Sequence, residues 1–263
     1  MSKIVEVDER NKNYVIKRLR LNVLRNLFVI YDLIYEPDKS VTYVAYENDN
    51  LSGLLLLYKS TPPMVRIDGE EHIVYRLLEY LPNDNMILYC PPSLVNMVRN
   101  KFPQANCYLE YQMYVGKGEQ NFITPNLATK LESKHTQLLA GLYSSAPQGE
   151  PRLSKERIKE LLETGCRFFG VFDEERLVSV AGSIKRLPEV GEITGVFTHP
   201  KYRGKGFATM ATSSATEHIL RYSNGSTLYV GAYNKPAIRV YEKLGYRKID
   251  EWYWVDIGTG IRP

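Results

Sequence analysis

Hydrophobic residues recur along this chain with two spacings: every three or four residues in some segments and every second residue in others. The first spacing predicts helices and the second predicts half-buried strands. The stripe of Val15, Leu19, Val23 and Leu27, for example, predicts a helix. The first half of the chain is predicted to contain a helix (12–30), a strand hairpin (41–48 and 51–60), a short strand (64–67), a helix (70–81), a buried strand (85–92), a helix (93–102) and a strand (106–115).

A glycine-containing segment, 116–122, interrupts this pattern and is the predicted linker. The second half then predicts a helix (126–142), a loop (144–152), a helix from Ser154, a hairpin around Asp173-Glu174-Glu175, a strand (191–198), a helix (206–222), a strand (226–232), a helix (235–244) and a strand (246–257). Both halves therefore share one order of elements. That order predicts an α/β protein with a mixed central sheet flanked by helices.

Composition narrows the class of protein. The chain has 263 residues, long enough for one large domain or two ordinary ones. Its 3 cysteines share no metal-binding spacing, which argues against a disulfide framework or a metal site. The N-terminus is charged and no apolar run reaches the length of a membrane span, so we expect a cytoplasmic protein without a membrane partner.

The net charge of +4 is spread along the chain, and the one modest basic cluster is Lys201-Tyr202-Arg203-Gly204-Lys205. Nucleic-acid binders usually concentrate their basic residues in a patch or arm. We therefore expect no nucleic-acid partner. Binding through this cluster and surface tyrosines is kept as an alternative, and strongly salt-dependent affinity for DNA or RNA would reveal it.

The segment richest in chemistry joins the strand 191–198 to the helix 206–222. Gly204 and Gly206 allow close approach of backbone N–H groups to a phosphate, and the helix N-terminus favours an anion. Arg203 and Lys205 supply positive charge, so the segment predicts a pyrophosphate site. The P-loop motif fails here because Gly206 follows Lys205. The dinucleotide fingerprint is weak because Thr209 stands at its last glycine and the strand 226–232 has no acidic residue.

A third phosphate motif, Arg/Gln-x-x-Gly-x-Gly/Ala, is met by Arg203, Gly206 and Ala208. Here the chain resembles the GNAT superfamily of acyl-CoA-dependent N-acyltransferases. The segment from Asn234 to Tyr246, with Ala237 and Tyr241-Glu242-Lys243, is similar to the family's second signature. The resemblance covers roughly residues 124–257.

The first half has the same element order but no glycine-rich loop after its third strand. The resemblance therefore implies a degenerate GNAT-like domain at 1–118, followed by a catalytic GNAT domain at 119–263. This two-part layout is similar to the glycine N-acyltransferase-like branch of the superfamily.

The resemblance implies acetyl-CoA as co-substrate and no metal. In the family, the fourth strand diverges from the fifth and pantetheine lies in the gap. Gly195 suits a bulge in that strand. The residues implied to hold the co-substrate are Val196, Phe197 and Thr198 for pantetheine through their backbone, Arg203, Gly204, Lys205, Gly206, Phe207, Ala208 and Thr209 for pyrophosphate, and Asn234 for the pantetheine arm.

Two residues are the candidates for catalysis. Tyr241 matches the family's general-acid tyrosine; the alternative is a core aromatic with its hydroxyl at the surface. Glu192 matches a glutamate that several members use as general base. Strand alternation predicts that it shares a face with Thr194, Val196 and Thr198. Partial burial would raise the pKa of Glu192, and a solvated strand-end glutamate is the open alternative.

Two further residues, His199 and Cys166, are expected to have no catalytic role or a minor one. His199 would line the acceptor channel or be a solvated loop residue. Cys166 is expected to be a buried thiol rather than a nucleophile.

The function implied is N-acetyltransferase: transfer of an acetyl or short acyl group from acetyl-CoA to a primary amine by direct attack on the thioester. The acceptor pocket is expected beside residues 126–164 with the loop 144–152, which has no charge cluster to select the acceptor. An amino acid, a polyamine-like molecule and a protein amine all stay open. The alternative function is a non-catalytic CoA-binding or sensing module on a GNAT fold. The sequence does not predict an oligomeric state.

Overall fold

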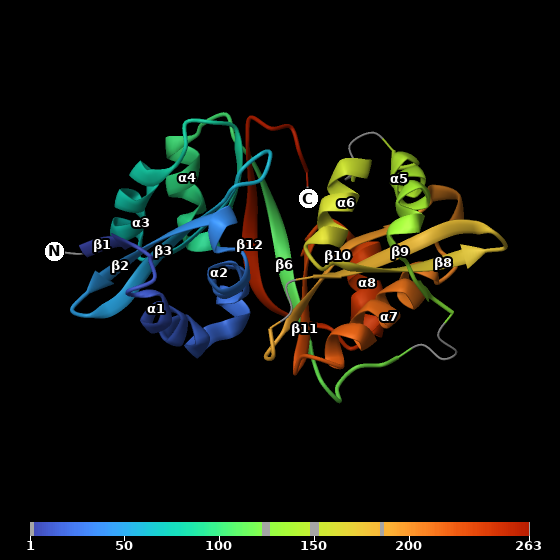
Figure 1. Cartoon of the computed structure of the whole chain (residues 1–263). Coiled ribbons are helices and arrows are strands. Elements are labelled where there is room, and N and C mark those ends of the chain that lie inside the picture. Colours follow the sequence, from blue (N-terminus) through green and yellow to red (C-terminus); the bar gives the residue numbers. More distant parts are fainter. Residues whose placement is uncertain (1–2, 123–126, 148–152, 185–186, 263) are drawn as a thin grey trace. The chain divides into compact units, whose positions relative to one another are not determined.

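A computed structural model of the chain describes residues 3–122, 127–147, 153–184 and 187–262, which form two compact units (Figure 1). Unit 1 comprises Met1–Glu110 and Glu251–Ile261, and unit 2 comprises Tyr111–Asp250 and Arg262–Pro263. Each unit is described by itself below. None of the helices in the described ranges combines the length and apolar character needed to cross a membrane.

The division between the units differs from the predicted boundary at residue 118. It falls inside a strand, β6 (Asn106–Gly116), and the chain returns to unit 1 near its end. The predicted linker is bound within unit 2, because Lys117 N–H donates to the Asn224 carbonyl (2.9 Å) and Asn121 N–H to the Leu244 carbonyl (3.0 Å). The glycine-containing segment is therefore part of unit 2 rather than a connection between the units.

Unit 1 contains a mixed sheet with the strand order β1-β2-β3-β4-β5-β12. Pairing is antiparallel from β1 to β4, parallel between β4 and β5, and antiparallel between β5 and the later part of β12. Figure 1 shows α1 and α2 on one face of this sheet and α3 and α4 on the other. The elements are β1 (Lys3–Glu6), α1 (Lys12–Leu19), α2 (Val23–Tyr35), β2 (Ser40–Glu47), β3 (Asn50–Tyr58), β4 (Met64–Gly69), α3 (Glu71–Leu77), β5 (Met86–Cys90), α4 (Val95–Lys101) and β12 (Arg247–Ile257).

Unit 2 contains the order β6-β11-β10-β9-β8-β7. One hydrophobic core packs α7 and α8 on a face of the sheet, and a second packs α5 and α6 on the opposite face (Figure 1). Pairing is antiparallel among β7, β8, β9 and β10, and parallel between β10 and β11. The elements are β7 (Thr129–Lys130), α5 (Thr136–Ser144), α6 (Lys155–Glu163), β8 (Arg167–Asp173), β9 (Arg176–Ile184), β10 (Gly191–Thr198), α7 (Phe207–Leu220), β11 (Gly225–Gly231) and α8 (Lys235–Lys243).

Most predicted elements form within a few residues of their expected ends. The hairpin turn at Asn48 and Asp49 adopts left-handed φ values of 46° and 63°, as two-residue hairpin turns require. Ser154 caps α6, because its hydroxyl accepts the Arg157 N–H at 3.1 Å. The two halves therefore repeat an element order, as the hydrophobic pattern predicts.

Three predictions of secondary structure are wrong or incomplete. The helix expected over 12–30 is two helices, α1 and α2, joined by a tight 3₁₀ turn at Arg20–Asn22. The helix expected over 126–142 begins only at Thr136; position 126 and part of the predicted loop 144–152 lie outside the described residues. The Leu131 side chain is buried in the core beneath α5 and α6, and its N–H donates to the Phe168 carbonyl of β8, so its apolar spacing is not helical. The short strand β1 is not predicted at all.

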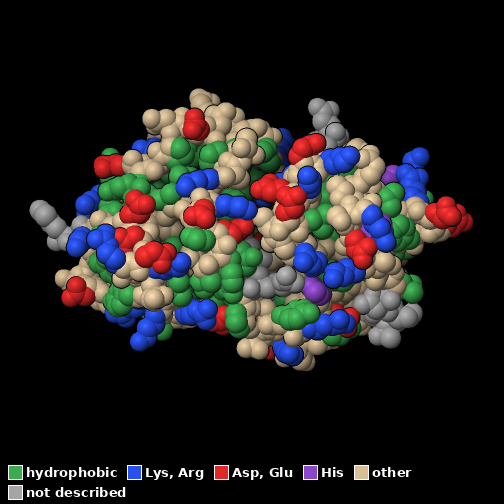
Figure 2. Space-filling model, in the orientation of Figure 1, with side chains coloured by type: hydrophobic (Ala, Val, Ile, Leu, Met, Phe, Trp, Pro, Cys, Tyr) green, Lys and Arg blue, Asp and Glu red, His purple; other side chains and the backbone are tan. Residues whose placement is uncertain are grey.

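Charge is mixed on the surface that Figure 2 shows. Lys and Arg side chains are interspersed there with Asp and Glu side chains, and no single basic patch dominates this face. The distribution agrees with a net charge of only +4.

A buried tyrosine ties together three elements of unit 2. The Tyr246 hydroxyl lies 2.8 Å from the hydroxyl of Thr216 on α7 and 2.7 Å from that of Ser226 on β11. The Tyr246 side chain is 2% exposed, so both hydrogen bonds are shielded from water. This network fixes α7 against β11 next to the start of β12.

We predict that Tyr246→Phe lowers the free energy of unfolding by about 1–3 kcal/mol, because Thr216 and Ser226 lose a buried partner. Urea denaturation of both proteins measures the difference. An unchanged unfolding midpoint would show that the network does not stabilise unit 2.

Candidate active site

The candidate site begins where two parallel strands of unit 2 separate. β10 pairs with β11 only at Gly191–Ser226 and Glu192–Thr227, although both strands continue for several residues. Beyond these pairs the strands diverge, and the backbone of β10 from Ile193 onward is not paired with β11. A gap between parallel strands leaves backbone groups that an extended ligand can pair with.

A bulge in β10 accompanies this separation. The register against β9 shifts between Thr194 and Phe197, and Gly195 has a left-handed φ of 58°. The expectation of a bulge at Gly195 is confirmed. Residues directly opposite in an antiparallel pair share a face.

The bulge overturns part of the predicted alternation. Glu192, Thr194 and Phe197 stand opposite Ile184, Gly182 and Val180, so they share the face that carries α5 and α6. Thr198 stands opposite Ser179, on the face that carries α7 and α8. The prediction that Glu192 and Thr198 share a face is therefore wrong, because the bulge inserts residues into the strand.

The segment after β10, residues 199–206, is termed the glycine loop. Arg203 Nε donates to the Thr198 carbonyl at 3.2 Å, and its guanidinium lies 5.7 Å from the Phe197 ring centre. Gly204 and Gly206 have φ values of 77° and 85°, which favour glycine. These contacts fix the path by which the loop enters α7.

The start of α7 is suited to an anion. Gly206 caps the helix with no side-chain hydrogen bond, so the first backbone N–H groups, from Phe207, Ala208 and Thr209, have no side-chain acceptor from the cap. A Cβ placed on Gly204 or Gly206 would meet no atom within 4 Å. The glycines are thus required by backbone conformation and leave open space above the helix N-terminus.

Positive charge surrounds the same loop. Lys205 Nζ lies 5.3 Å from the ring centre of Tyr202, and the Arg176 guanidinium lies 5.6 Å from the same ring. Together with Arg203 and the helix dipole, these groups create the field that a pyrophosphate needs. The residues present therefore fit the diphosphate of a CoA thioester.

His199 is part of the loop's framework. Its Nδ1 accepts the Lys201 N–H at 3.2 Å, and its Nε2 lies 3.0 Å from the Arg176 guanidinium. Partial burial, and then the charges of Arg176, Lys201 and Arg203, lower the pKa of His199. These contacts join His199 to the phosphate side of the site.

Asn234 and Tyr241 belong to α8: Asn234 is its N-cap and Tyr241 lies within it. The Asn234 side-chain carbonyl caps the helix by accepting the Ala237 N–H at 3.2 Å. Tyr241 is 6% exposed and packs in the core beneath α7 and α8, with its ring centre 6.2 Å from that of Tyr246. Burial raises the pKa of Tyr241, so its phenol keeps its proton at neutral pH.

The two neighbouring tyrosines differ in what their hydroxyls do. Tyr246 bonds to Thr216 and Ser226, whereas no described residue forms a hydrogen bond to the Tyr241 hydroxyl. The Tyr246 hydroxyl is therefore held by two partners, whereas the Tyr241 hydroxyl has none among the described residues. Glu192, on the opposite face of the sheet, is half-buried.

Tyr143 is a site residue that the sequence reasoning missed. It lies on α5, is 3% exposed, and its hydroxyl donates to the carbonyl of Gly195 at the bulge. Its ring lies 5.5 Å from that of Phe197. No motif marks it, since its role depends on a contact between positions 52 residues apart.

At the corresponding strand-to-helix junction of unit 1, the described residues form no equivalent phosphate cradle. β4 pairs with β3 without a register shift, and α3 follows almost directly, at Glu71. Glu70 and Glu71 give the junction negative charge, and His72 lies 3.0 Å from a carboxylate oxygen of Glu47. A Cβ on Gly69 would meet backbone atoms at 2.5 Å, so no open space exists there.

Solved structures share this fold over nearly the whole chain. A Drosophila protein superposes with a TM-score of 0.77 at 11% identity, covering 98% of this chain and 99% of its own. A GCN5-related N-acetyltransferase from Sphaerobacter thermophilus gives 0.62 at 13% identity, with coverage of 100% and 98%. A tandem GNAT protein from the clavulanic acid biosynthesis pathway gives 0.62 at 14% identity, with coverage of 98% and 99%. The predicted fold class is confirmed: the chain has a tandem GNAT fold.

Comparison with protein-family models gives a match within the second half of the chain. Residues 168–255 match the family model described as FR47-like protein. No curated protein matches the chain by sequence. The matched range includes β10, the glycine loop, α7 and α8, so it contains the candidate site, and together with the fold it supports the GNAT superfamily.

We predict that Tyr143→Phe loosens the bulge, because the Gly195 carbonyl loses its donor in a buried setting. Unfolding free energy should fall by about 1 kcal/mol, and amide hydrogen exchange of β10 around Gly195 should accelerate. Tyr75→Phe, at a tyrosine that is 67% exposed, is the control and should leave both unchanged. Equal exchange rates in Tyr143→Phe and the parent would refute this role.

Proposed function

We propose that the protein is an N-acyltransferase that transfers an acetyl or other short acyl group from CoA to a primary amine. The proposal rests on two features that occur together in unit 2. The strands β10 and β11 separate after Glu192 and Thr227, which suits the extended, amide-containing arm of a CoA thioester. The glycine loop leads to a helix N-terminus without a side-chain cap, which suits its pyrophosphate.

The pyrophosphate would lie on the N–H groups of Phe207, Ala208 and Thr209, with Arg203 and Lys205 offsetting its charge. The pantetheine arm would follow the gap between β10 and β11, beside the backbone of Val196, Phe197 and Thr198. The carbonyls of Gly195, Phe197 and Thr198 already accept bonds from Tyr143, Ser179 and Arg203. The arm would therefore use the remaining groups of the strand, with Asn234 at its side.

The reaction requires a neutral amine to attack the thioester carbonyl and a proton for the departing thiolate. Glu192 faces the α5 and α6 side of the sheet, so we assign the acceptor amine to that side and Glu192 as its base, directly or through a water. Tyr241 lies on the other face with its proton held, and we assign it as the acid. The amine then loses one proton, the thiolate gains one, and the C–S bond is exchanged for C–N.

The two units have different roles in this proposal. Unit 2 carries the chemistry, whereas unit 1, with its acidic β4–α3 junction, binds no acyl-CoA. The domain assignment, a degenerate GNAT-like first half and a catalytic second half, belongs to the same proposal. The similarity to the glycine N-acyltransferase-like branch stays a prediction.

The glycine loop is tested by Gly206→Asp. Aspartate tolerates a left-handed φ and is a good helix cap, so the variant should fold, yet its carboxylate would occupy the phosphate position. We expect CoA affinity to fall at least about 100-fold, measured by isothermal titration calorimetry. Gly206→Asn is the matched control, since it has the same size without the charge. Unchanged CoA affinity in Gly206→Asp would refute the assigned loop.

The catalytic assignments are tested by Tyr241→Phe and Glu192→Gln, which keep shape and remove the acid or the base. Each should lower kcat by about 10²–10⁴-fold, with CoA affinity unchanged, as measured by thiol release with a panel of amines. Tyr246→Phe, at the neighbouring buried tyrosine, is the control and should keep its kcat.

The same assay distinguishes the alternative function. Tight CoA binding by the parent, with no thiol release for any amine, would identify a binding or sensing module instead. Full activity in Tyr241→Phe would show that another group donates the proton.

A further inference from the structure

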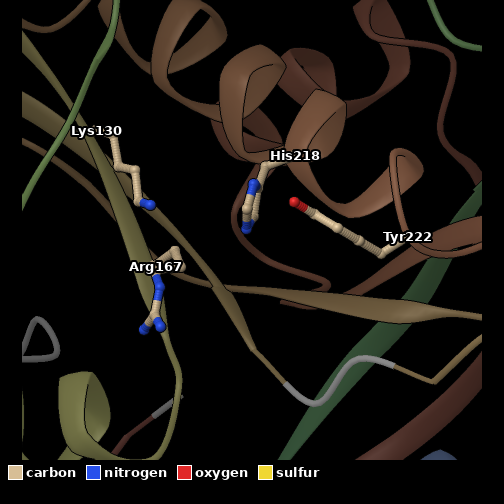
Figure 3. A pocket seen from close by; sticks show the side chains of 4 residues that line it. All are labelled: Lys130, Arg167, His218 and Tyr222. Carbon is tan, nitrogen blue, oxygen red and sulfur yellow. The ribbon is translucent and has the colours of Figure 1, made fainter.

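We propose that unit 2 carries a second anion site, for the phosphoryl group of a small molecule, at the end of α7 away from the glycine loop. A pocket of about 400 Å³ lies there, lined by Lys130, Arg167, His218 and Tyr222 (Figure 3). α7 has 14 residues, and at 1.5 Å per residue its two ends lie about 21 Å apart. The pocket is therefore separate from the proposed acyl-CoA site.

The charge of the pocket comes from two strands at the edge of the sheet. Lys130 on β7 stands opposite Phe169 of β8, and Arg167 is two residues before Phe169, so both lie on the face that carries α7. No carboxylate of the described residues lies within ion-pair distance of either cation. Glu132 pairs with Lys134 at 3.1 Å, and the hydrogen bond from Lys134, followed by smaller contributions that include the charge of Lys130, lowers the pKa of Glu132. One nitrogen of the Arg167 guanidinium donates to the Cys166 carbonyl at 2.9 Å.

Aromatic rings form the opposite wall. The His218 ring centre lies 5.3 Å from that of Phe169 and 5.4 Å from that of Tyr222, with which it makes an edge contact. Figure 3 shows the Lys130 ammonium and the Tyr222 hydroxyl on either side of the His218 ring, while the Arg167 guanidinium on β8 is turned away from the other three side chains. The residues that line the pocket therefore come from three separate elements, β7, β8 and α7 with the turn that follows it.

The end of a helix normally repels anions because its last carbonyls are free. Here the Ile219 carbonyl accepts N–H groups from both Tyr222 and Ser223, each at 2.9 Å. This reduces the negative potential beside His218. Two full positive charges then decide the sign of the site.

The geometry favours a phosphoryl group over a carboxylate. Donors that approach from three elements need an acceptor with oxygens in several directions, which a tetrahedral phosphate has and a planar carboxylate lacks. The pocket is open to solvent, since Lys130 and Tyr222 are both exposed, so a phosphate monoester would bind at the surface with its organic part against His218 and Tyr222.

The test uses the full chain carrying Gly206→Asp, in which the glycine loop is blocked, so the outcome does not depend on the proposed acyl transfer. Inorganic phosphate is titrated at constant ionic strength, and its Kd is read from chemical-shift changes. Adding Lys130→Met and Arg167→Met together should raise that Kd by about tenfold or more. Lys130→Met alone should raise it by a smaller factor and guards against loss of folding in the double variant.

Lys159→Met with Arg157→Met is the charge-matched control, because both of these cations form surface ion pairs on α6, on the other face of the sheet, and it should leave the Kd unchanged. The site is refuted if the Lys130 and Arg167 variants bind phosphate like the parent, or if chloride produces the same response. Tighter binding of succinate than of phosphate would overturn the assignment to a phosphoryl group.

Discussion

The separation of β10 from β11 is the constraint on which the rest of the site depends. Two parallel strands buried in a sheet normally continue to pair, because unpaired backbone groups are costly away from water. Here pairing ends after Glu192 and Thr227, at a bulge whose Gly195 carbonyl is held by Tyr143. The bulge also sets which face each following residue occupies. Glu192 and Tyr241 lie on opposite faces of the sheet, and this is the arrangement on which the proposed base and acid roles rest.

The two units show how one order of elements can serve different purposes. In unit 2 the strand-to-helix junction contains two left-handed glycines and several cations, and open space lies above it. In unit 1 the corresponding junction is short, acidic and closed by the backbone of β3. The difference lies in a few residues of one loop, while the sheets and helices around the loops follow the same plan.

Structural features that depend on local pattern are predicted by the sequence. The glycine loop and the start of α7 are predicted from residues 203–209, because the glycines, the helix start and the flanking cations are adjacent in the chain. The role of Tyr143 is not predicted, because its hydrogen bond to Gly195 joins distant segments. The face of Thr198 is predicted wrongly because alternation assumes an unbroken strand. The division between Glu110 and Tyr111 has no local signal, because both look like ordinary strand residues in the sequence.

The most direct test of the central claim is a crystal structure of the full chain soaked or co-crystallised with CoA. We expect density for the pyrophosphate at the N-terminus of α7, against the glycine loop, and density for the pantetheine arm between β10 and β11, ending near Tyr241. The proposed acyl-CoA site would be contradicted by CoA bound at unit 1. It would also be contradicted by a pyrophosphate away from Gly204 and Gly206 with no ligand in the gap between β10 and β11.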